Sequence, residues 1–165
     1  MIPVQIRAAL PRDQSILREM LYHALYVAPG REAFSPDIVD RPELARYVSN
    51  WGGEGDLGLI ASDAETSEVF GAAWVRLLRG ENRGYGYVDD DTAELCIAVV
   101  PQQRNKQIGT ELLTQLFRMA QQHYSAISLS VAAENPAMHL YQRLGFQTVS
   151  NHAGAVVMKK RFHGI

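Results

Sequence analysis

The sequence predicts an α/β fold in which one sheet combines antiparallel and parallel strands. In the first part of the 165-residue chain, strand-like runs at residues 57–62, 69–78 and 92–100 are separated by short turn-rich segments, which is typical of an antiparallel meander. After Pro101, helices and strands alternate, which is typical of a βαβ unit with parallel strands. One domain over residues 1–165 accounts for this length.

The N-terminal part predicts a strand and then an amphipathic helix. Asp13 is placed to cap this helix, whose apolar residues recur at helical spacing, and Pro29 with Gly30 is expected to end it. The other elements expected from the pattern are a strand at 4–10, a short helix at 42–48, a helix from about 108 to 124, a strand at 126–131, a helix between Asn135 and Gly145, and closing strands at 146–150 and 155–160.

Composition argues against several classes of protein. The formal net charge of −2 does not suit binding to nucleic acid, and the longest apolar runs fall well short of the ~20 residues that span a bilayer. The single cysteine, Cys96, cannot form an intramolecular disulfide, and the N-terminus does not resemble a secretory leader. The five histidines show no ligand spacing. We therefore expect a cytoplasmic protein that binds no nucleic acid, no membrane and no metal.

The junction between the strand at 92–100 and the next helix is a candidate anion site. The first N–H groups of a helix lack backbone acceptors, and the helix dipole places about half a positive charge there. Gly109 lets a ligand approach the backbone closely, and Arg104 and Lys106 add positive charge. The spacing alone leaves open an ordinary turn with solvated basic side chains.

Two stretches resemble the Gcn5-related N-acetyltransferase superfamily. Residues 104–109 are similar to its Arg/Gln-x-x-Gly-x-Gly/Ala signature, although Gln107 stands where an inner glycine is usual. We expect no positive φ at Gln107 if the helix begins in the ordinary way. Residues 135–146 are close to the pattern Asn-x-x-Ala-x-x-Leu-Tyr-x-x-x-Gly-Phe. The resemblance covers essentially the whole chain and is strongest from Glu94 to Phe146.

The resemblance implies a fold and a ligand. The fold is a mixed, mostly antiparallel sheet with a central parallel strand pair, flanked by helices. The ligand is acetyl-CoA, the acyl donor, held by its pyrophosphate with no further cofactor. The residues that the resemblance assigns to this coenzyme are Val99, Arg104, Asn105, Lys106, Gln107, Ile108, Gly109, Thr110, Asn135 and Tyr141.

Two residues are candidates for catalysis. Tyr141 matches the family's general acid, because a phenol stays protonated at neutral pH and can donate to a departing thiolate; filling the core is its other interpretation. Glu94 is the candidate base for the amine, with a surface or salt-bridge role as the alternative. By the same resemblance, backbone N–H groups near Val99 stabilise the oxyanion. Cys96 is interpreted as a strand residue without a covalent role.

The sequence therefore predicts an N-acetyltransferase that moves an acetyl group from acetyl-CoA directly to a primary amine. The alternative is a non-catalytic acyl-CoA-binding sensor or partner module. The amine belongs to a small molecule or a protein, and residues 31–55 and 80–91 are expected to select it. Within the second segment, residues 89–91 are three aspartates, which either attract a cationic acceptor or form a solvated turn. The oligomeric state stays open, a homodimer included.

Overall fold

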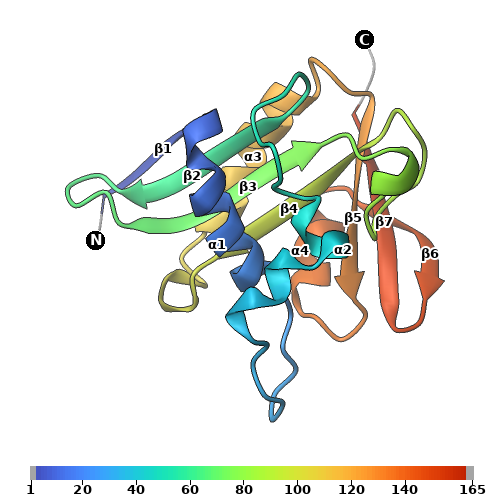
Figure 1. The fold of residues 1–165 in the computed structure, drawn as a ribbon, viewed down its shortest axis with the longest axis horizontal. Helices are drawn as coiled ribbons and strands as arrows, with labels where there is room; N and C mark the ends of the chain where they lie inside the picture. The colour runs from blue at the N-terminus through green and yellow to red at the C-terminus, as the bar shows by residue number, and fades with distance from the viewer. Residues whose placement is uncertain (1–2, 163–165) are drawn as a thin grey trace.

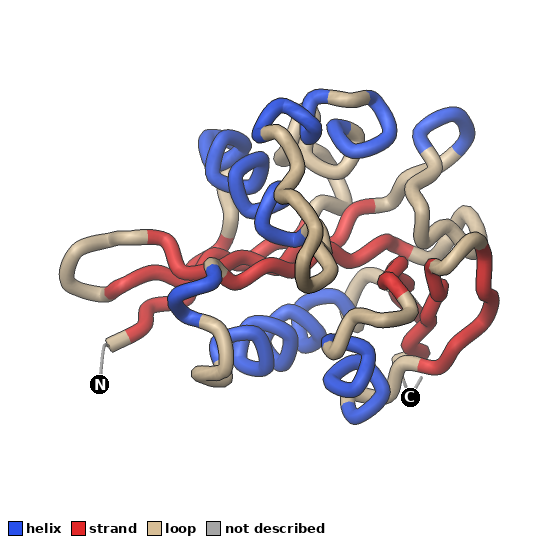
Figure 2. Tube along the Cα trace, turned by 90° about the horizontal axis from the view of Figure 1, so that it is seen from below, coloured by secondary structure: helices blue, strands red, loops and turns tan. Residues whose placement is uncertain are grey.

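A computed structural model describes residues 3–162 of the chain. One seven-stranded sheet has helices on both faces, as Figure 2 shows. The strands are β1 (Val4–Ala8), β2 (Leu57–Asp63), β3 (Val69–Arg76), β4 (Ala93–Val99), β5 (Ala126–Ala132), β6 (Gln147–His152) and β7 (Ala155–Arg161). The α-helices are α1 (Gln14–Ala24), α2 (Pro42–Ala45), α3 (Ile108–Ala120) and α4 (Ala137–Arg143), and four 3-10 turns lie at Pro11–Asp13, Pro36–Asp40, Gly80–Asn82 and Pro101–Gln103.

The strand order confirms the predicted mixed sheet. It runs β1-β2-β3-β4-β5-β7-β6. The first four strands form an antiparallel meander, β4 and β5 are parallel, and β7 pairs antiparallel with both β5 and β6. Because a parallel pair needs a crossover connection, α3 joins β4 to β5 over one face of the sheet.

The parallel pair is much shorter than its two strands. Pairing with β5 is limited to Ala93 opposite Ile127 and Glu94 opposite Ser128, although each strand has seven residues. Beyond Glu94 the strands part, and Figure 1 shows β4 and β5 starting together and diverging along their length. The sheet is therefore open at its centre, toward the carboxyl ends of both strands.

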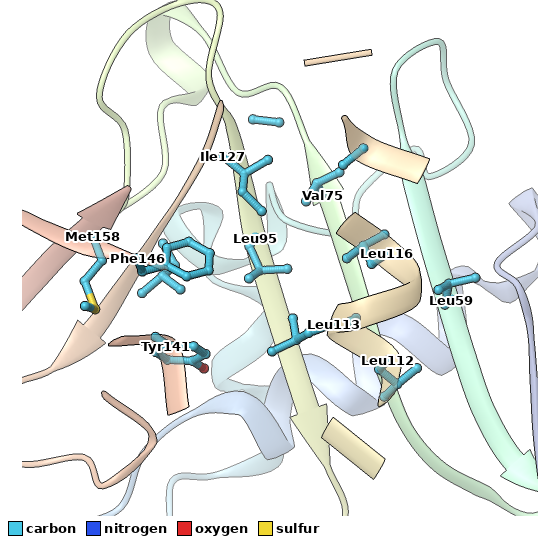
Figure 3. Close-up of a cluster of buried hydrophobic side chains, with 14 of the residues drawn as sticks. Leu59, Val75, Leu95, Leu112, Leu113, Leu116, Ile127, Tyr141, Phe146 and Met158 are labelled. Atoms are coloured by element: carbon cyan, nitrogen blue, oxygen red, sulfur yellow. The ribbon is translucent and has the colours of Figure 1, made fainter. Parts of the chain in front are cut away.

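Two apolar cores, one on each face, fix the helices to the sheet. On one face α3 and α4 contribute Leu112, Leu113, Leu116 and Tyr141, which pack with Leu95 and Ile127 of the central strands (Figure 3). On the other face α1 buries Leu17, Met20 and Leu21 against Ile60, Ala72 and Trp74. The apolar stripes expected for these helices are thus the buried ones.

Helix ends differ from the expected positions. The first helix ends at Ala24, before Pro29, because Leu25 already has extended backbone with φ −73° and ψ 123°. Residues after Ala24 consequently form a loop, and Leu25, Tyr26 and Val27 of this loop line one cavity together with the last residues of β4. In residues 3–162, no helix combines the length and apolar character that crossing a membrane requires.

Candidate functional site

A cleft of about 870 Å³ occupies the opening between β4 and β5. Its walls come from segments far apart in the sequence: the end of α1 and the loop after it, the last residues of β4, the start of α3, and α4. Since α1 lies on one face of the sheet and α3 and α4 on the other, the cleft passes through the sheet.

The β4 edge that faces this cleft has free backbone groups. Val100 N donates to Phe70 O (2.8 Å), so by the alternation of an antiparallel ladder Ala98 and Cys96 are bonded to β3. The N–H groups of Ile97 and Val99 point to the opposite edge, where the pairing with β5 has already ended at Glu94. This edge therefore presents backbone donors to any ligand in the cleft.

The start of α3 adds further free donors. The first intrahelical hydrogen bond runs from Glu111 N to Gln107 O (3.1 Å), so the amides of Ile108, Gly109 and Thr110 have no helical acceptor. All three residues line the cleft. The positive end of the α3 dipole thus meets the cleft, which is the arrangement expected for an anion.

The loop before α3 corrects one expectation. Gln107 has φ +66° and Asn105 has φ +64°, both in the left-handed region. The expectation that position 107 needs no positive φ is therefore wrong. The physical reason is that the chain must turn sharply out of the 3-10 turn at residues 101–103 before α3 begins, and the glycine usual at this position would adopt that conformation without strain.

Replacing Gln107 should consequently stabilise the protein. The left-handed conformation costs a non-glycine residue about 1–2 kcal/mol, so Gln107→Gly should raise the melting temperature by about 2–8 °C. Asn105→Gly is the matched control, because asparagine tolerates this conformation better and its gain should be smaller. Thermal unfolding of both variants checks this, and a lower melting temperature for Gln107→Gly would contradict it.

Gly109 is open toward the cleft, and the packing does not require a glycine there. A Cβ there would lie 3.7 Å from Ile97 Cδ1 and 3.8 Å from Val99 Cγ2, which is ordinary contact. Glycine inside a helix is destabilising by about 0.5–1 kcal/mol relative to alanine, so folding alone gives no reason for it. The missing side chain instead keeps the first turn of α3 accessible from the cleft.

Bulk at position 109 should therefore affect the ligand more than the fold. Gly109→Val should weaken acetyl-CoA binding by about tenfold or more, because its methyl groups would occupy the space beside the free amides. Gly109→Ala is the graded control and should leave the melting temperature unchanged or higher. Calorimetric titration of both folded variants measures the effect. Wild-type affinity in Gly109→Val would exclude this turn as the binding surface.

The two basic side chains of the predicted anion site behave differently. Arg104 lines the cleft, where Nε donates to Val99 O (3.0 Å) and a terminal nitrogen donates to His23 O (3.2 Å). Its guanidinium thereby ties the loop before α3 to the end of α1. Lys106 is exposed, its Nζ lies 3.3 Å from Gln103 Oε1, and it is not among the lining residues. Arg104 is the charge that the structure places at the site.

Asn135 lies one residue before the N-cap position of α4, which is Pro136 and not Asn135 as expected. Its Oδ1 still accepts from Ala137 N (2.9 Å), the first residue of the helix, and the residue also lines the cleft. Within residues 3–162 its side-chain amide has no hydrogen-bond partner. The donor end of Asn135 is therefore available to a ligand.

Tyr141 lies on α4 where the cleft meets the core. The residue is 9% exposed and packs edge-on against Phe146, with ring centroids 5.9 Å apart. Figure 3 shows its hydroxyl directed toward β4, and the residue lines the cleft. Burial, with a smaller contribution from Cys96, raises the pKa of Tyr141 to about 12. The phenol therefore remains protonated and is available as a donor inside the cleft.

Glu94 is placed away from the cleft. It is 1% exposed and its carboxylate accepts three hydrogen bonds: Oε1 from Tyr47 Oη (2.8 Å) and Gly86 N (2.9 Å), and Oε2 from Gly84 N (2.8 Å). Burial raises the pKa of Glu94, while these three donors oppose the rise. The base role stays a prediction, and the observed contacts are those of a carboxylate that anchors a loop.

The close packing of this loop explains why positions 84 and 86 are glycines. A Cβ at Gly84 would collide with Tyr47 Oη and Glu94 Oε1, and one at Gly86 would lie 2.8 Å from the Leu129 carbonyl carbon. Ser128 Oγ donates to Gly86 O (2.6 Å). Residues 84–86 thus form the loop expected from the sequence, in which the amides of Gly84 and Gly86 donate to the Glu94 carboxylate. The loop closes the end of the sheet where β4 and β5 still pair.

The match to known proteins agrees with this geometry. Residues 18–146 match the model of the Acetyltransferase (GNAT) family. The chain belongs to the GNAT family. No curated protein sequence matches it. Solved structures share the fold, among them a Gcn5-related N-acetyltransferase from Kribbella flavida with 23% identity and a TM-score of 0.65, which covers 96% of this chain and 98% of that one.

Two similar structures were determined with a coenzyme. YncA of Salmonella typhimurium, described as a putative acetyltransferase with acetyl-CoA, has 20% identity and a TM-score of 0.64, covering 96% of this chain and 93% of its own. PaiA N-acetyltransferase of Thermoplasma acidophilum, in complex with coenzyme A, has 20% identity and a TM-score of 0.63, covering 98% and 100%. At these identities the likeness establishes the fold.

The GNAT cleft also contains residues that sequence reasoning missed. On α4 they are His139 and Arg143, which share one helical stripe with Pro136 and could have been found from the i, i+3, i+7 spacing. Within residues 3–162 no hydrogen bond or ion pair engages Arg143. On the other face the missed residues are Tyr22, His23, Tyr26, Val27, Ala33 and Phe34, which no local pattern links to residues 97–110.

Some residues that we expected to recruit or select the acceptor lie outside the cleft of this GNAT chain. Asp89 contacts Thr92 and Lys159, Asp90 accepts from Tyr87, and Asp91 lies 4.0 Å from Arg79, all near the amino end of β4. Steering of an acceptor at the cleft by these aspartates is therefore not supported. Of the two segments expected to select the acceptor, residues 31–55 reach the cleft through Ala33 and Phe34, and residues 80–91 do not line it.

Cys96 lies on β4 with intermediate exposure of the residue as a whole. Desolvation of its thiol by the surrounding protein raises the pKa of the thiol. In the part of the chain that the structure describes, no cluster of three or more His, Cys, Asp or Glu side chains is arranged to hold a metal ion.

Proposed function

We propose that this GNAT chain transfers an acetyl group from acetyl-CoA directly to a primary amine. One observation carries the proposal: the opening between β4 and β5 joins free β4 amides, the open first turn of α3 and the Tyr141 hydroxyl in a single cleft. These groups suit an acyl thioester that ends in a pyrophosphate. Relatives of the same fold bound to acetyl-CoA and to coenzyme A add support for the donor.

Different residues of the cleft would contact different parts of acetyl-CoA. The amides of Ile108, Gly109 and Thr110, together with Arg104, would hold the pyrophosphate. The free backbone N–H groups of Ile97 and Val99 on the β4 edge would contact the acyl portion of the donor. The donor amide of Asn135 and the unpaired guanidinium of Arg143 would contact the rest of the coenzyme from α4. This division assigns the donor to backbone amides, to Arg104 and Arg143, and to Asn135.

The transfer itself then needs three events. The amine nitrogen attacks the thioester carbonyl carbon, and the carbonyl oxygen gains negative charge that β4 amides would stabilise. The carbon–sulfur bond breaks and the sulfur takes a proton from Tyr141 Oη. The amine loses one proton, which passes to a base or to water, and solvent reprotonates Tyr141. Glu94 would take part only through an intervening group, because its carboxylate does not line the cleft.

Two measurements test the function. Acetyl-CoA at a concentration one hundred times its dissociation constant should stabilise the folded protein by about 2.7 kcal/mol and so raise its melting temperature. NAD and ATP should raise the melting temperature much less. A panel of primary amines should release coenzyme A thiol and form the acetylated amine. Equal stabilisation by all three nucleotides would contradict a dedicated donor site. Binding without transfer to any amine would favour the acyl-CoA sensor instead.

A further inference from the structure

The cleft has a second end on the α1 face of the sheet. This end is formed by Tyr22, His23, Tyr26, Val27 and Phe34, and the Tyr22 hydroxyl donates to Phe34 O (2.6 Å), which fixes the loop after α1. The groups assigned to the donor lie on the α3 and α4 face and at the β4 edge. An acceptor that meets the acyl group while the donor is bound must therefore enter from the α1 face.

No acidic side chain lines this cleft. Among residues 3–162 the lining contains neither aspartate nor glutamate, although the chain has 18 acidic residues. The charged side chains that do line it are Arg104 and Arg143, with His23 and His139 as the imidazoles. The aspartates of residues 89–91 lie near the amino end of β4, away from this mouth.

The mouth is instead apolar and aromatic. Val27 is 36% exposed and Phe34 is 42% exposed, and both face a cleft whose other α1-side residues include two tyrosines. Exposed apolar side chains that gather at a concave site mark a surface for an apolar ligand. Aromatic faces also attract a single ammonium group through cation–π interaction, so an amine can enter without a carboxylate.

Among the lining residues that the structure describes, a second positive charge would find no carboxylate. Moving an ion out of water is costly unless a counter-charge or hydrogen bonds replace its solvation. Sites that select polycations are complementary in charge, and the lining of this cleft carries cations and no carboxylate. The composition of the mouth therefore disfavours polyamines, aminoglycosides and lysines in basic peptides.

We propose that the acceptor is a monoamine with an apolar body, an alkylamine or arylalkylamine, which lies against Tyr22, Tyr26, Val27 and Phe34. This inference rests on the proposed function, since it specifies the amine that the transferase uses. It assigns acceptor selection to the end of α1 and the loop after it.

A matched pair of amines tests the proposal. Hexylamine and 1,6-diaminohexane share a six-carbon chain with a terminal primary amine, and the diamine carries a second ammonium group in place of a hydrogen on the far carbon. We expect kcat/KM for hexylamine to exceed that for 1,6-diaminohexane by about tenfold or more. Equal values, or a preference for the diamine, would overturn the inference and leave the transferase function standing.

Two glutamate substitutions locate the selection. Val27→Glu places a carboxylate at the mouth and should reduce the hexylamine preference several-fold, with KM for acetyl-CoA unchanged. Val149→Glu is the control: Val149 is 49% exposed on β6, lies outside the cleft lining and receives the same charge. Its preference should equal that of the wild type. An unchanged preference in a folded Val27→Glu variant would exclude this surface as the selecting one.

A binding measurement separates failure of the inference from failure of the proposed function. If no amine is acetylated, the function is wrong, and calorimetry of the same two amines with the coenzyme A-bound protein still tests the mouth. Tighter binding of hexylamine would then support an apolar amine site in a non-catalytic protein. Equal or weaker binding of hexylamine would overturn the inference as well.

Discussion

Tyr141→Phe should lower the rate of acetyl transfer by about 10²–10⁴ while changing acetyl-CoA affinity far less. The change removes only the hydroxyl, which is directed toward β4 in a residue that lines the cleft. The ring remains to pack against Phe146, so the fold should be preserved. Because charge develops on sulfur only as the thioester breaks, the loss belongs to the transition state.

Steady-state rates with a responsive amine, together with acetyl-CoA titration, measure this effect. Tyr124→Phe is the matched control: Tyr124 is partly buried and its hydroxyl donates to Gly55 O (2.7 Å), outside the cleft. That variant should lose some stability and keep its rate. Full activity in Tyr141→Phe would show that the residue fills the core and that another group protonates the thiolate.

Glu94→Gln should destabilise the protein by about 2–3 kcal/mol, or about 4–12 °C in melting temperature. The glutamine amide presents an N–H group where the carboxylate accepts one, so a backbone donor of Gly84 or Gly86 loses its buried partner. The anchored loop then loosens at the point where β4 and β5 pair. The rate per folded molecule should stay within about tenfold of the wild type at every pH, because Glu94 does not line the cleft.

The pH profile distinguishes the two roles of Glu94. A base acting on the amine predicts the greatest loss at low pH, where free amine is scarce, and little change in melting temperature. The structural role predicts a lower melting temperature and a ratio of variant rate to wild-type rate that does not change with pH. A selective loss of activity at low pH in a fully stable variant would restore Glu94 as the base.

Local sequence predicted several residues that line the cleft at the start of α3 and on α4. The residues from Arg104 to Gly109 form a strand-to-helix junction whose function depends on backbone geometry, and Tyr141 sits on a short helix bounded by Asn135 and Gly145. Both can be recognised because the contacts that matter lie within a few residues along the chain. Lys106 is the exception, since a long exposed side chain is not held in place by its neighbours.

The remaining features depend on contacts between distant segments. Two residue pairs join β4 to β5, which is much less than the length of either strand. No residue pattern in either strand indicates where the pairing ends. The position of Glu94 depends on Tyr47 and on the loop of residues 84–86, which reach it from elsewhere in the chain. The α1 end of the cleft likewise requires that Tyr22 and Phe34 meet across a loop. Periodicity and propensity describe single elements and therefore do not contain these placements.

The short pairing between β4 and β5 also divides the sheet mechanically. Strands β1–β4 and strands β5–β7 each form a continuous hydrogen-bonded ladder, whereas the seam between them has two residue pairs and the loop anchored by Glu94. Regions joined by few hydrogen bonds open locally at lower free energy than the ladders on either side. A molecule that fills the opening would contact both halves of the sheet at once and would oppose their separation. Occupancy of the cleft would then set how cooperatively the two halves of the sheet unfold.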